Sequence, residues 1–137
     1  MPISTQTKRY KSITEESGRE RQLSGLFTVI SNNLLVATEI LSTDYKIKAV
    51  SELELLSKRA RVFSKELASN SYELNQEEMD DKISYLKNRM LSLVEDLTSE
   101  LTKLDANKNS DKRAIENIIV VKRLLRDSQR GLITIQD

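Results

Sequence analysis

Apolar residues recur at helical spacing in four stretches of this chain. In the first stretch, steps of four and three residues join Leu23, Phe27, Ile30, Leu34, Ala37 and Leu41. In the second stretch, the same steps join Ala49, Leu53, Leu56, Ala60, Phe63 and Leu67. Each set lies on one face of an α-helix. The regular alternation of four and three is the heptad pattern of helices that cross at a shallow angle.

The third and fourth stretches begin at clear helix-start signals. Asn75 can cap the third helix, and Glu78 follows three residues later, as in a capping box. The apolar face of this helix then comprises Met79, Ile83, Leu86, Met90, Leu93, Leu97 and Leu101 or Leu104. Ser110 or Asp111 can cap the fourth helix. Its inner stripe is formed by Ala114, Ile118, Val121 and Leu125.

Turn and capping residues set the boundaries of these helices. Ser42, Thr43 and Asp44 are all good N-cap residues, so they mark a break between the first and second helices. Gly131 is a typical C-terminal stop for the fourth helix. We therefore predict helices at about residues 19–42, 45–69, 76–104 and 111–130, within one helical domain over residues 19–131.

The two ends of the chain lack this helical pattern. Residues 1–18 are polar, basic and rich in Ser and Thr, and we predict that they form a flexible arm. Residues 132–137 form a C-terminal tail, in which Leu132 to Ile135 alternate with the period of a β-strand. The tail could dock on a partner or cover the end of the domain.

The fold class follows from the helical pattern and from the scarcity of residues that interrupt it. The chain has 3 Gly and 1 Pro, and β-branched residues form no alternating runs within residues 26–130. Short connections force each helix back along its predecessor. We predict an all-α fold, an elongated antiparallel up-down-up-down four-helix bundle. The alternative is a three-helix bundle or a helical hairpin that is completed by oligomerisation.

The composition excludes much of the chemistry that small helical domains perform. The 137 residues include no Cys and no His, so there is no thiol nucleophile, no disulfide framework and no zinc site of the usual nitrogen and sulfur type. The chain has no Gly-rich phosphate loop either. Adjacent carboxylates such as Glu77 and Glu78 point apart on a helix and cannot share a substrate. We predict that the chain is not an enzyme and has no cofactor.

The net charge of +1 conceals an uneven distribution. Residues 70–105 carry 4 basic and 9 acidic groups, whereas residues 106–130 carry 7 basic and 3 acidic groups. Neighbouring third and fourth helices would therefore attract one another. The basic fourth helix has no aromatic residue for base stacking, so there is no strong nucleic-acid signal. An electrostatic tether to anionic lipid or nucleic acid, through the arm and the fourth helix, is one alternative function.

The sequence also carries indications of a cellular location. The absence of Cys and of any Asn-x-Ser/Thr acceptor site is compatible with a reducing compartment. No window has the run of about 18 consecutive apolar residues that reads as a spanning helix. We predict a cytoplasmic protein without a transmembrane segment, with a nuclear location left open.

One loop contains oxygen-bearing residues at the spacing of a calcium site. Oxygen-bearing residues stand at positions 1, 3, 5 and 12 of a loop of the EF-hand type, and the candidate ligands are Asp105, Asn107, Asn109, Asp111 and Glu116. Position 6 is Ser110, where the backbone turn of this loop requires Gly, and no second loop is present. A calcium-responsive helix-loop-helix module is therefore a second alternative function, and an Asx-rich interhelical turn is the simpler interpretation.

Apolar residues outside the inner stripes indicate a protein-binding surface. Off-stripe apolar residues are Leu26, Val29, Val36 and Ile40 in the first helix, Leu91 and Val94 in the third, and the run Ile118 to Val121 in the fourth. A bundle helix needs only one apolar stripe. We predict that helical segments of other proteins, or further copies of the chain, bind at Val36, Ile40, Ile119 and Val120, with a charged rim of Lys122, Arg123 and Arg126.

The leading hypothesis is a non-enzymatic helical interaction module, a scaffold or adaptor subunit of an intracellular assembly. The leucine heptads after residues 43–46 resemble those of several families, namely regulatory bundles of membrane-fusion proteins, spectrin-like repeats and small subunits of vesicle-trafficking or cytoskeletal complexes. Because shared heptads report geometry and not ancestry, we assign the chain to none of these families.

Overall fold

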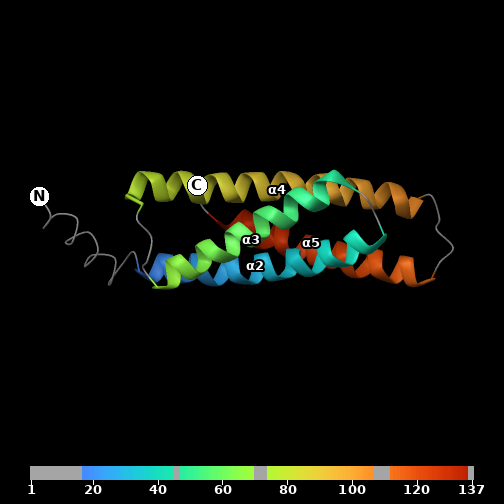
Figure 1. Cartoon of the computed structure of the whole chain (residues 1–137), viewed down its shortest axis with the longest axis horizontal. Coiled ribbons are helices and arrows are strands. Elements are labelled where there is room, and N and C mark those ends of the chain that lie inside the picture. Colours follow the sequence, from blue (N-terminus) through green and yellow to red (C-terminus); the bar gives the residue numbers. More distant parts are fainter. Residues whose placement is uncertain (1–16, 45–46, 70–73, 107–111, 136–137) are drawn as a thin grey trace, which may run out of the picture.

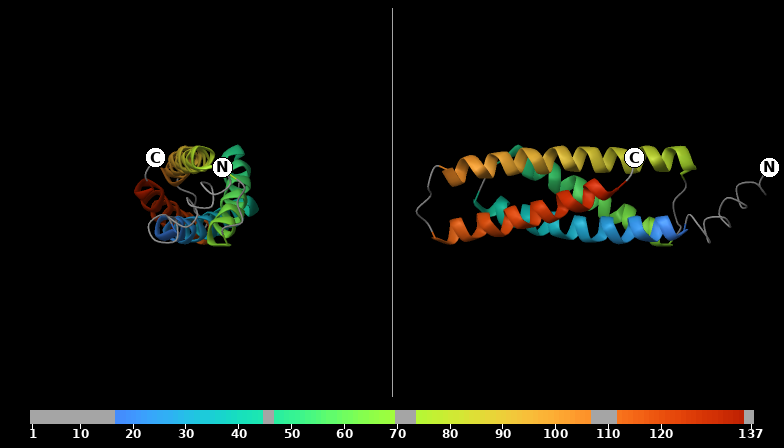
Figure 2. Two further views of the ribbon diagram at one scale, coloured as in Figure 1. Left: turned by 90° about the vertical axis from the view of Figure 1, so that its left-hand side faces the viewer. Right: turned by 180° about the vertical axis from the view of Figure 1, so that it is seen from behind.

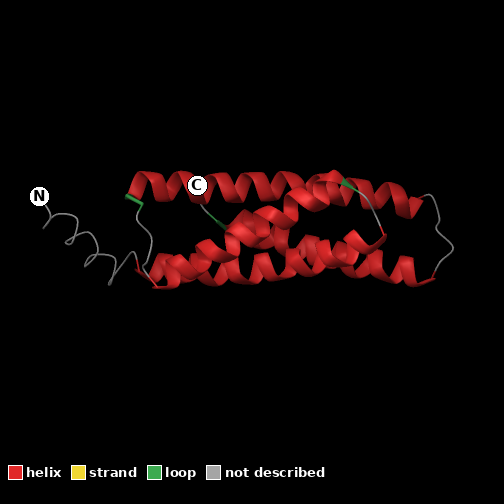
Figure 3. Cartoon of the chain, in the orientation of Figure 1, coloured by secondary structure: helices red, strands yellow, loops and turns green. Residues whose placement is uncertain are grey.

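The computed structural model describes residues 17–44, 47–69, 74–106 and 112–135, and these form four α-helices. Figure 1 labels them α2 (Ser17–Asp44), α3 (Lys48–Ser69), α4 (Gln76–Ala106) and α5 (Lys112–Thr134). The described ranges contain no strand (Figure 3). Successive helices run in opposite directions along one long axis (Figure 1).

The four helices surround a single core. Helix α2 contacts α3 and α5, and α4 contacts the same two helices, so the order around the bundle is α2, α3, α4, α5. The view along the axis shows this ring of helices (Figure 2). The prediction of an elongated up-down-up-down four-helix bundle is therefore confirmed. The alternative of a three-helix bundle or hairpin completed by oligomerisation is not what the structure shows.

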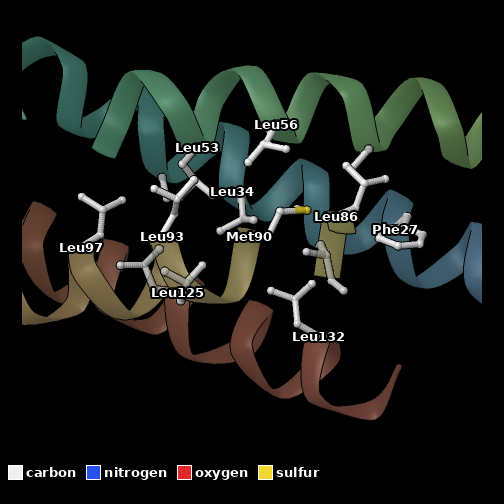
Figure 4. Close-up of a cluster of buried hydrophobic side chains, with 14 of the residues drawn as sticks. Phe27, Leu34, Leu53, Leu56, Leu86, Met90, Leu93, Leu97, Leu125 and Leu132 are labelled. Carbon is white, nitrogen blue, oxygen red and sulfur yellow. The ribbon is translucent and has the colours of Figure 1, made fainter. Parts of the chain in front are cut away.

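The predicted apolar stripes form the core. Figure 4 shows their side chains meeting between the helices, among them Phe27, Leu34, Leu53, Leu86, Met90, Leu97 and Leu125. Every described member of the four stripes is buried except Ala49, which is half-buried at the start of α3. Burial of such side chains is the main stabilising contribution in a small domain. Heptad spacing therefore predicted the inner face of each helix correctly.

Helix α4 begins where its capping residue predicts. The backbone N–H of Glu78 donates a hydrogen bond to the side-chain Oδ1 of Asn75 over 2.8 Å. This bond satisfies one of the N–H groups that the first turn of a helix leaves without a partner. The predicted start at residue 76 is confirmed, and α4 continues to Ala106, two residues beyond the predicted end.

The predicted break between the first two helices is displaced. The hydroxyl groups of Ser42 and Thr43 donate to the backbone oxygen of Glu39, within the last turn of α2. They therefore close α2 and do not cap α3. Helix α2 continues to Asp44, and α3 begins at Lys48 and not at residue 45. Ser and Thr hydroxyls can satisfy backbone groups in either way, so their presence alone does not decide the boundary.

The predicted end of α5 and the predicted tail are wrong. Helix α5 passes through Gly131 and ends at Thr134. Leu132 and Ile135, at 0% and 2% exposure, extend the buried stripe of α5 and do not form part of a β-like tail. Gly131 lies where α5 approaches α2 closely, because a Cβ atom added there would be 3.0 Å from Cδ1 and Cγ1 of Ile30. Gly131 therefore provides room for the side chain of Ile30, and it does not form a turn.

Gly25 in α2 and Gly131 in α5 provide a matched test of this interpretation. Gly25→Ala is expected to raise the free energy of unfolding by about 0.5–1 kcal/mol, because Ala favours the helix and nothing lies within 4 Å of the new Cβ. Gly131→Ala should raise the free energy of unfolding by less than Gly25→Ala does, or should lower it, because the new Cβ atom would press on buried Ile30. Urea denaturation of both variants measures the difference, and equal stabilisation would show that α5 does not need Gly at residue 131.

Helices α2 and α3 form the most closely packed pair in the bundle. Small side chains lie in their buried faces, namely Ser24, Ser31 and Thr38 in α2 and Ser57, Ala60 and Ser64 in α3. The hydroxyl of Ser24 donates to the backbone oxygen of Ser64 over 2.7 Å and so links the two helices. Buried polar groups with such partners carry little desolvation penalty. The apolar stripes alone did not indicate this close approach.

Candidate partner-binding surface

The outer face of α2 is almost free of charge. Residues 22–43 contain one charged side chain, Glu39, in a chain of which 31% of the residues are charged. Val29 and Val36 are 58% and 48% exposed on this helix. Apolar residues on a surface with few charges are typical of sites that bind another protein. This face of α2 is therefore the first candidate for partner binding.

A second heptad-spaced stripe runs along the outside of α2. Steps of four and three join its exposed residues, which are Gly25, Val29, Asn32, Val36, Glu39 and Thr43. Each lies two residues after a member of the buried stripe, and two residues correspond to about 200° around a helix. Helix α2 thus has one heptad face toward the core and another toward solvent. We call these exposed residues the outer stripe. Of its members, only the two valines stand out in the sequence as apolar residues outside the inner stripe.

The neighbouring part of α5 extends this surface. Gly131 lies level with Ile30. Because α2 and α5 are antiparallel, Ile40, ten residues after Ile30, lies at about the same height along the bundle as Val121, ten residues before Gly131. Val120 is next to Val121 in sequence, so Ile40 and Val120 lie near the same level. Val120 and Gly131 both lie about 100° or less from the inner stripe of α5, on the side that faces α2. Val120 is 45% exposed, whereas Ile40 is half-buried against the core.

The structure does not bring all the predicted binding residues together. Ile119 is 53% exposed, but it lies two residues from buried Val121 and so faces away from the bundle. Lys122 and Arg126 lie on the flank of α5 opposite Val120, toward α4. Arg123 is exposed and lies two residues from both Val121 and Leu125, so it also faces away from the bundle. The surface that the structure assembles is therefore Val36, Ile40 and Val120, without the predicted charged rim.

Other off-stripe residues are less available than the sequence predicts. Val94 in α4 has 0% exposure and belongs to the core. Leu26, Ile40 and Leu91 are partly buried and pack against the core. The core is wider than a single heptad stripe, and it absorbs the apolar residues next to that stripe. The surplus is confined to positions that point away from the neighbouring helices.

Helix α2 also meets a simple test for a membrane-crossing segment. Residues Gly18–Thr43 are long enough, and an 18-residue window within them has a mean hydropathy of 1.3, although the sequence analysis predicted no such segment. In the fold, 39% of that window is buried. The apolar character of α2 comes from its buried stripe together with the valines of its outer stripe.

The predicted calcium loop falls mostly outside the described residues. Asn107, Asn109 and Asp111 lie in the range 107–111, and Asp105 belongs to the last turn of α4. Glu116 is exposed in the second turn of α5. Among the described side chains, no group of three or more Asp or Glu residues is placed to hold a metal ion. Calcium binding therefore stays a prediction.

The described geometry is the basis for a functional conclusion. Comparison of the chain with protein-family models, with curated protein sequences and with solved structures gave no match. Function must therefore be inferred from what the surface of the bundle presents, namely the outer stripe of α2 and the adjacent edge of α5.

Proposed function

We propose that this chain is a non-enzymatic helical interaction module that binds a helix of a partner protein along the outer stripe of α2. In this role it serves as a scaffold or adaptor subunit of a cytoplasmic assembly, of the kind found in vesicle trafficking or the cytoskeleton. One observation carries the proposal. Exposed Val29 and Val36 lie on a heptad-spaced face that has a single charge over residues 22–43.

The shape of this face suits a straight helix as the partner. Helix α2 has 28 residues, which corresponds to about 42 Å at 1.5 Å per residue. Its outer stripe consists of small, apolar and amide side chains and one carboxylate, Glu39, and a second helix can meet such a stripe by knobs-into-holes packing. Val120 on α5 widens the surface at one end. An Asn such as Asn32 within an apolar seam favours one register over others.

A site-specific crosslink tests this proposal. A photoreactive amino acid at residue 36 of the full chain, activated in a lysate, is expected to label one peptide with apolar residues at positions i, i+3 or i+4, and i+7. The same substitution at Ser99, an exposed residue of α4, should not label that peptide. The captured segment is then synthesised, and its affinity is measured by fluorescence anisotropy.

The substitution that tests the affinity must leave the core intact. Val36→Asp is expected to lower the affinity for the synthetic segment at least about tenfold, because it places a charge in the desolvated centre of the contact. Ile40 is less suitable, because its half-buried side chain also packs against the core. Ser99→Asp adds the same charge on α4 and should leave the affinity unchanged. An unaltered affinity in Val36→Asp would contradict the proposal.

The two alternative functions rest on weaker observations. Residues 1–16 of the predicted arm and residues 107–111 lie outside the described residues, whereas Ser17 and Gly18, predicted as part of the arm, begin α2. The described residues therefore do not test calcium binding or an electrostatic tether through the arm. Both stay predictions. Calorimetry with calcium and the salt dependence of binding to anionic vesicles would test them.

A further inference from the structure

A groove between α3 and α4 forms a second surface, separate from the outer stripe of α2. It has a volume of about 390 Å³ and is open along one side. Its lining combines three basic with three apolar or aromatic residues, namely Lys58, Arg59 and Val62 from α3 and Lys82, Tyr85 and Leu86 from α4. Most of the lining surface is apolar. Such a groove offers both apolar contacts and a positive rim.

The apolar residues of the groove are exposed although they lie beside the core. Val62 and Tyr85 are each 56% exposed, and Leu55, two turns before Val62 on the same side of α3, is 52% exposed. Leu86 is buried and forms part of the floor. Large exposed apolar side chains that gather at one groove are typical of a site that another molecule covers.

The cations of the groove are held in place by neighbouring groups. The ammonium of Lys82 lies 4.7 Å from the centroid of the Phe63 ring, where the ring face attracts a positive charge. Lys58 forms an ion pair of 3.1 Å with Glu54, one turn earlier on α3. Arg89, one turn beyond Tyr85, pairs with Glu52 over 2.6 Å. The positive side chains are therefore partly ordered before any ligand binds, which lowers the entropy cost of binding.

The described lining residues include no carboxylate, although Glu54 pairs with Lys58 at the edge of the groove, and the excess of cations favours an acidic occupant. Lys58, Arg59 and Lys82 contribute three positive charges to the described lining. A second copy that docked through the same groove would place these cations against their own counterparts. On the acidic outer face of α4, where Asp96 and Glu100 are exposed, the described side chains include no exposed apolar residue near these two that could fill the groove. Self-association is thus disfavoured, and a different molecule with negative charges is required.

We propose that the α3–α4 groove binds an acidic amphipathic helix of another protein. Apolar side chains on one face of that helix pack on Val62, Tyr85 and Leu55, while carboxylates along its flanks meet Arg59, Lys82 and Lys58. The groove is lined by about one turn of α3 and one turn of α4, and an apolar face of a helix can pack into it. Leu55 is not part of this lining, but it lies about 10 Å from Val62 along the same side of α3 at 1.5 Å per residue, so a ligand of two or more turns can reach both residues.

Binding is tested with a synthetic probe of this chemistry. The probe is a fluorescein-labelled peptide of about 16 residues, with Leu at positions i, i+3 or i+4, and i+7 and Glu at the flanking positions. A matched peptide carries Lys in place of each Glu. At about 0.15 M salt, the acidic peptide is expected to bind the full chain with micromolar affinity, and the basic peptide is expected to bind at least about tenfold more weakly.

Two variants of the protein locate the site. Arg59→Glu should lower the affinity for the acidic peptide at least about tenfold, because it reverses a charge at the rim of the groove. Arg61→Glu makes the same change of net charge two residues away, about 200° around α3 from Arg59, where the exposed side chain is not part of the groove lining, and it should leave the affinity within about twofold. Val62→Asp should abolish binding while helicity is retained. Circular dichroism of each variant verifies that the bundle is folded.

Several outcomes would overturn the proposal. They are the absence of binding up to about 1 mM acidic peptide, equal binding of the two peptides, and equal losses of affinity in Arg59→Glu and Arg61→Glu. Binding of phosphatidylserine vesicles that is lost in Arg59→Glu, without binding of the peptide, would assign the groove to a membrane instead. Val36→Asp serves as an independent control, since it alters only the outer stripe of α2 and should not change the affinity of the acidic peptide.

Discussion

Replacement of Phe63 by Ala is expected to lower the free energy of unfolding by about 3–5 kcal/mol. Phe63 has 0% exposure and is among the largest fully buried side chains of the bundle. Its ring meets the ring of Phe27 edge to face, with 5.7 Å between centroids and 63° between planes. The substitution removes this contact, the transfer energy of the ring and the support for Lys82, and it leaves a cavity between α2, α3 and α4. Urea denaturation followed by far-ultraviolet circular dichroism measures the loss.

Val62 provides the control for this experiment, because it precedes Phe63 in the same helix. Val62 is 56% exposed, and Val62→Ala should change the free energy of unfolding by no more than about 0.5 kcal/mol. The slope of the free energy against urea should be the same for both variants if each remains a cooperative fold. A loss below about 1 kcal/mol in Phe63→Ala would mean that the ring is not part of a close-packed core.

The sequence predicted the inner faces of the helices because that information is local. Leu53, Leu56, Ala60 and Phe63 follow one another at heptad spacing, and only a helix places such residues on one face. The start of α4 was predictable for the same reason, since Asn75 satisfies a backbone group three residues away. Short connections then left few topologies for four helices of similar length.

The boundaries that failed depend on contacts between distant residues. Gly131 resembles a helix stop in sequence, but it is a point of contact with Ile30, about a hundred residues earlier in the chain. Leu132 then continues the buried stripe, so apolar burial outweighs the cost of Gly within a helix. Helix propensity alone cannot indicate that another helix approaches at Gly131, and so the helix end predicted at residue 130 is four residues too early.

The candidate surfaces were predictable only in part. The sequence shows that apolar residues exceed the inner stripes, but it does not show which flank of a helix a neighbour covers. Val94 and Val36 are both off-stripe, yet one has 0% exposure and the other 48%. The α3–α4 groove was missed altogether, although Leu55 and Val62 lie seven residues apart in sequence. That spacing is a heptad signal of its own, and the stronger inner stripe of the same helix obscured it.

The distribution of small residues explains why the two proposed surfaces lie on different sides of the bundle. Helices α2 and α3 approach closely through Ser24, Ser57, Ala60 and Ser64, which are all buried. At the other flank of α3, Val62 and Tyr85 are exposed beside the groove between α3 and α4. Because α3 belongs to both interfaces, a change in its packing against α2 is expected to alter the groove on its other flank.

Enlargement of Ala60 should disturb this arrangement strongly. Ala60 has 0% exposure and lies one turn from both Ser57 and Ser64. Ala60→Leu is expected to lower the free energy of unfolding by about 1–3 kcal/mol, because the added side chain forces the helices apart or into strained rotamers. Helix propensity cannot account for such a loss, since Ala and Leu are both good helix formers.

Ala68→Leu is the matched control, because Ala68 is exposed near the end of the same helix. It should change the free energy of unfolding by no more than about 0.5 kcal/mol. The displaced α3 also carries Val62 and Arg59. Ala60→Leu should therefore lower the affinity for the acidic peptide more than Ala68→Leu does, when both are measured at a temperature where the variants are folded. Equal stability of the two variants would show that α3 has room against its neighbours, and the proposed link between close packing and the shape of the groove would then be wrong.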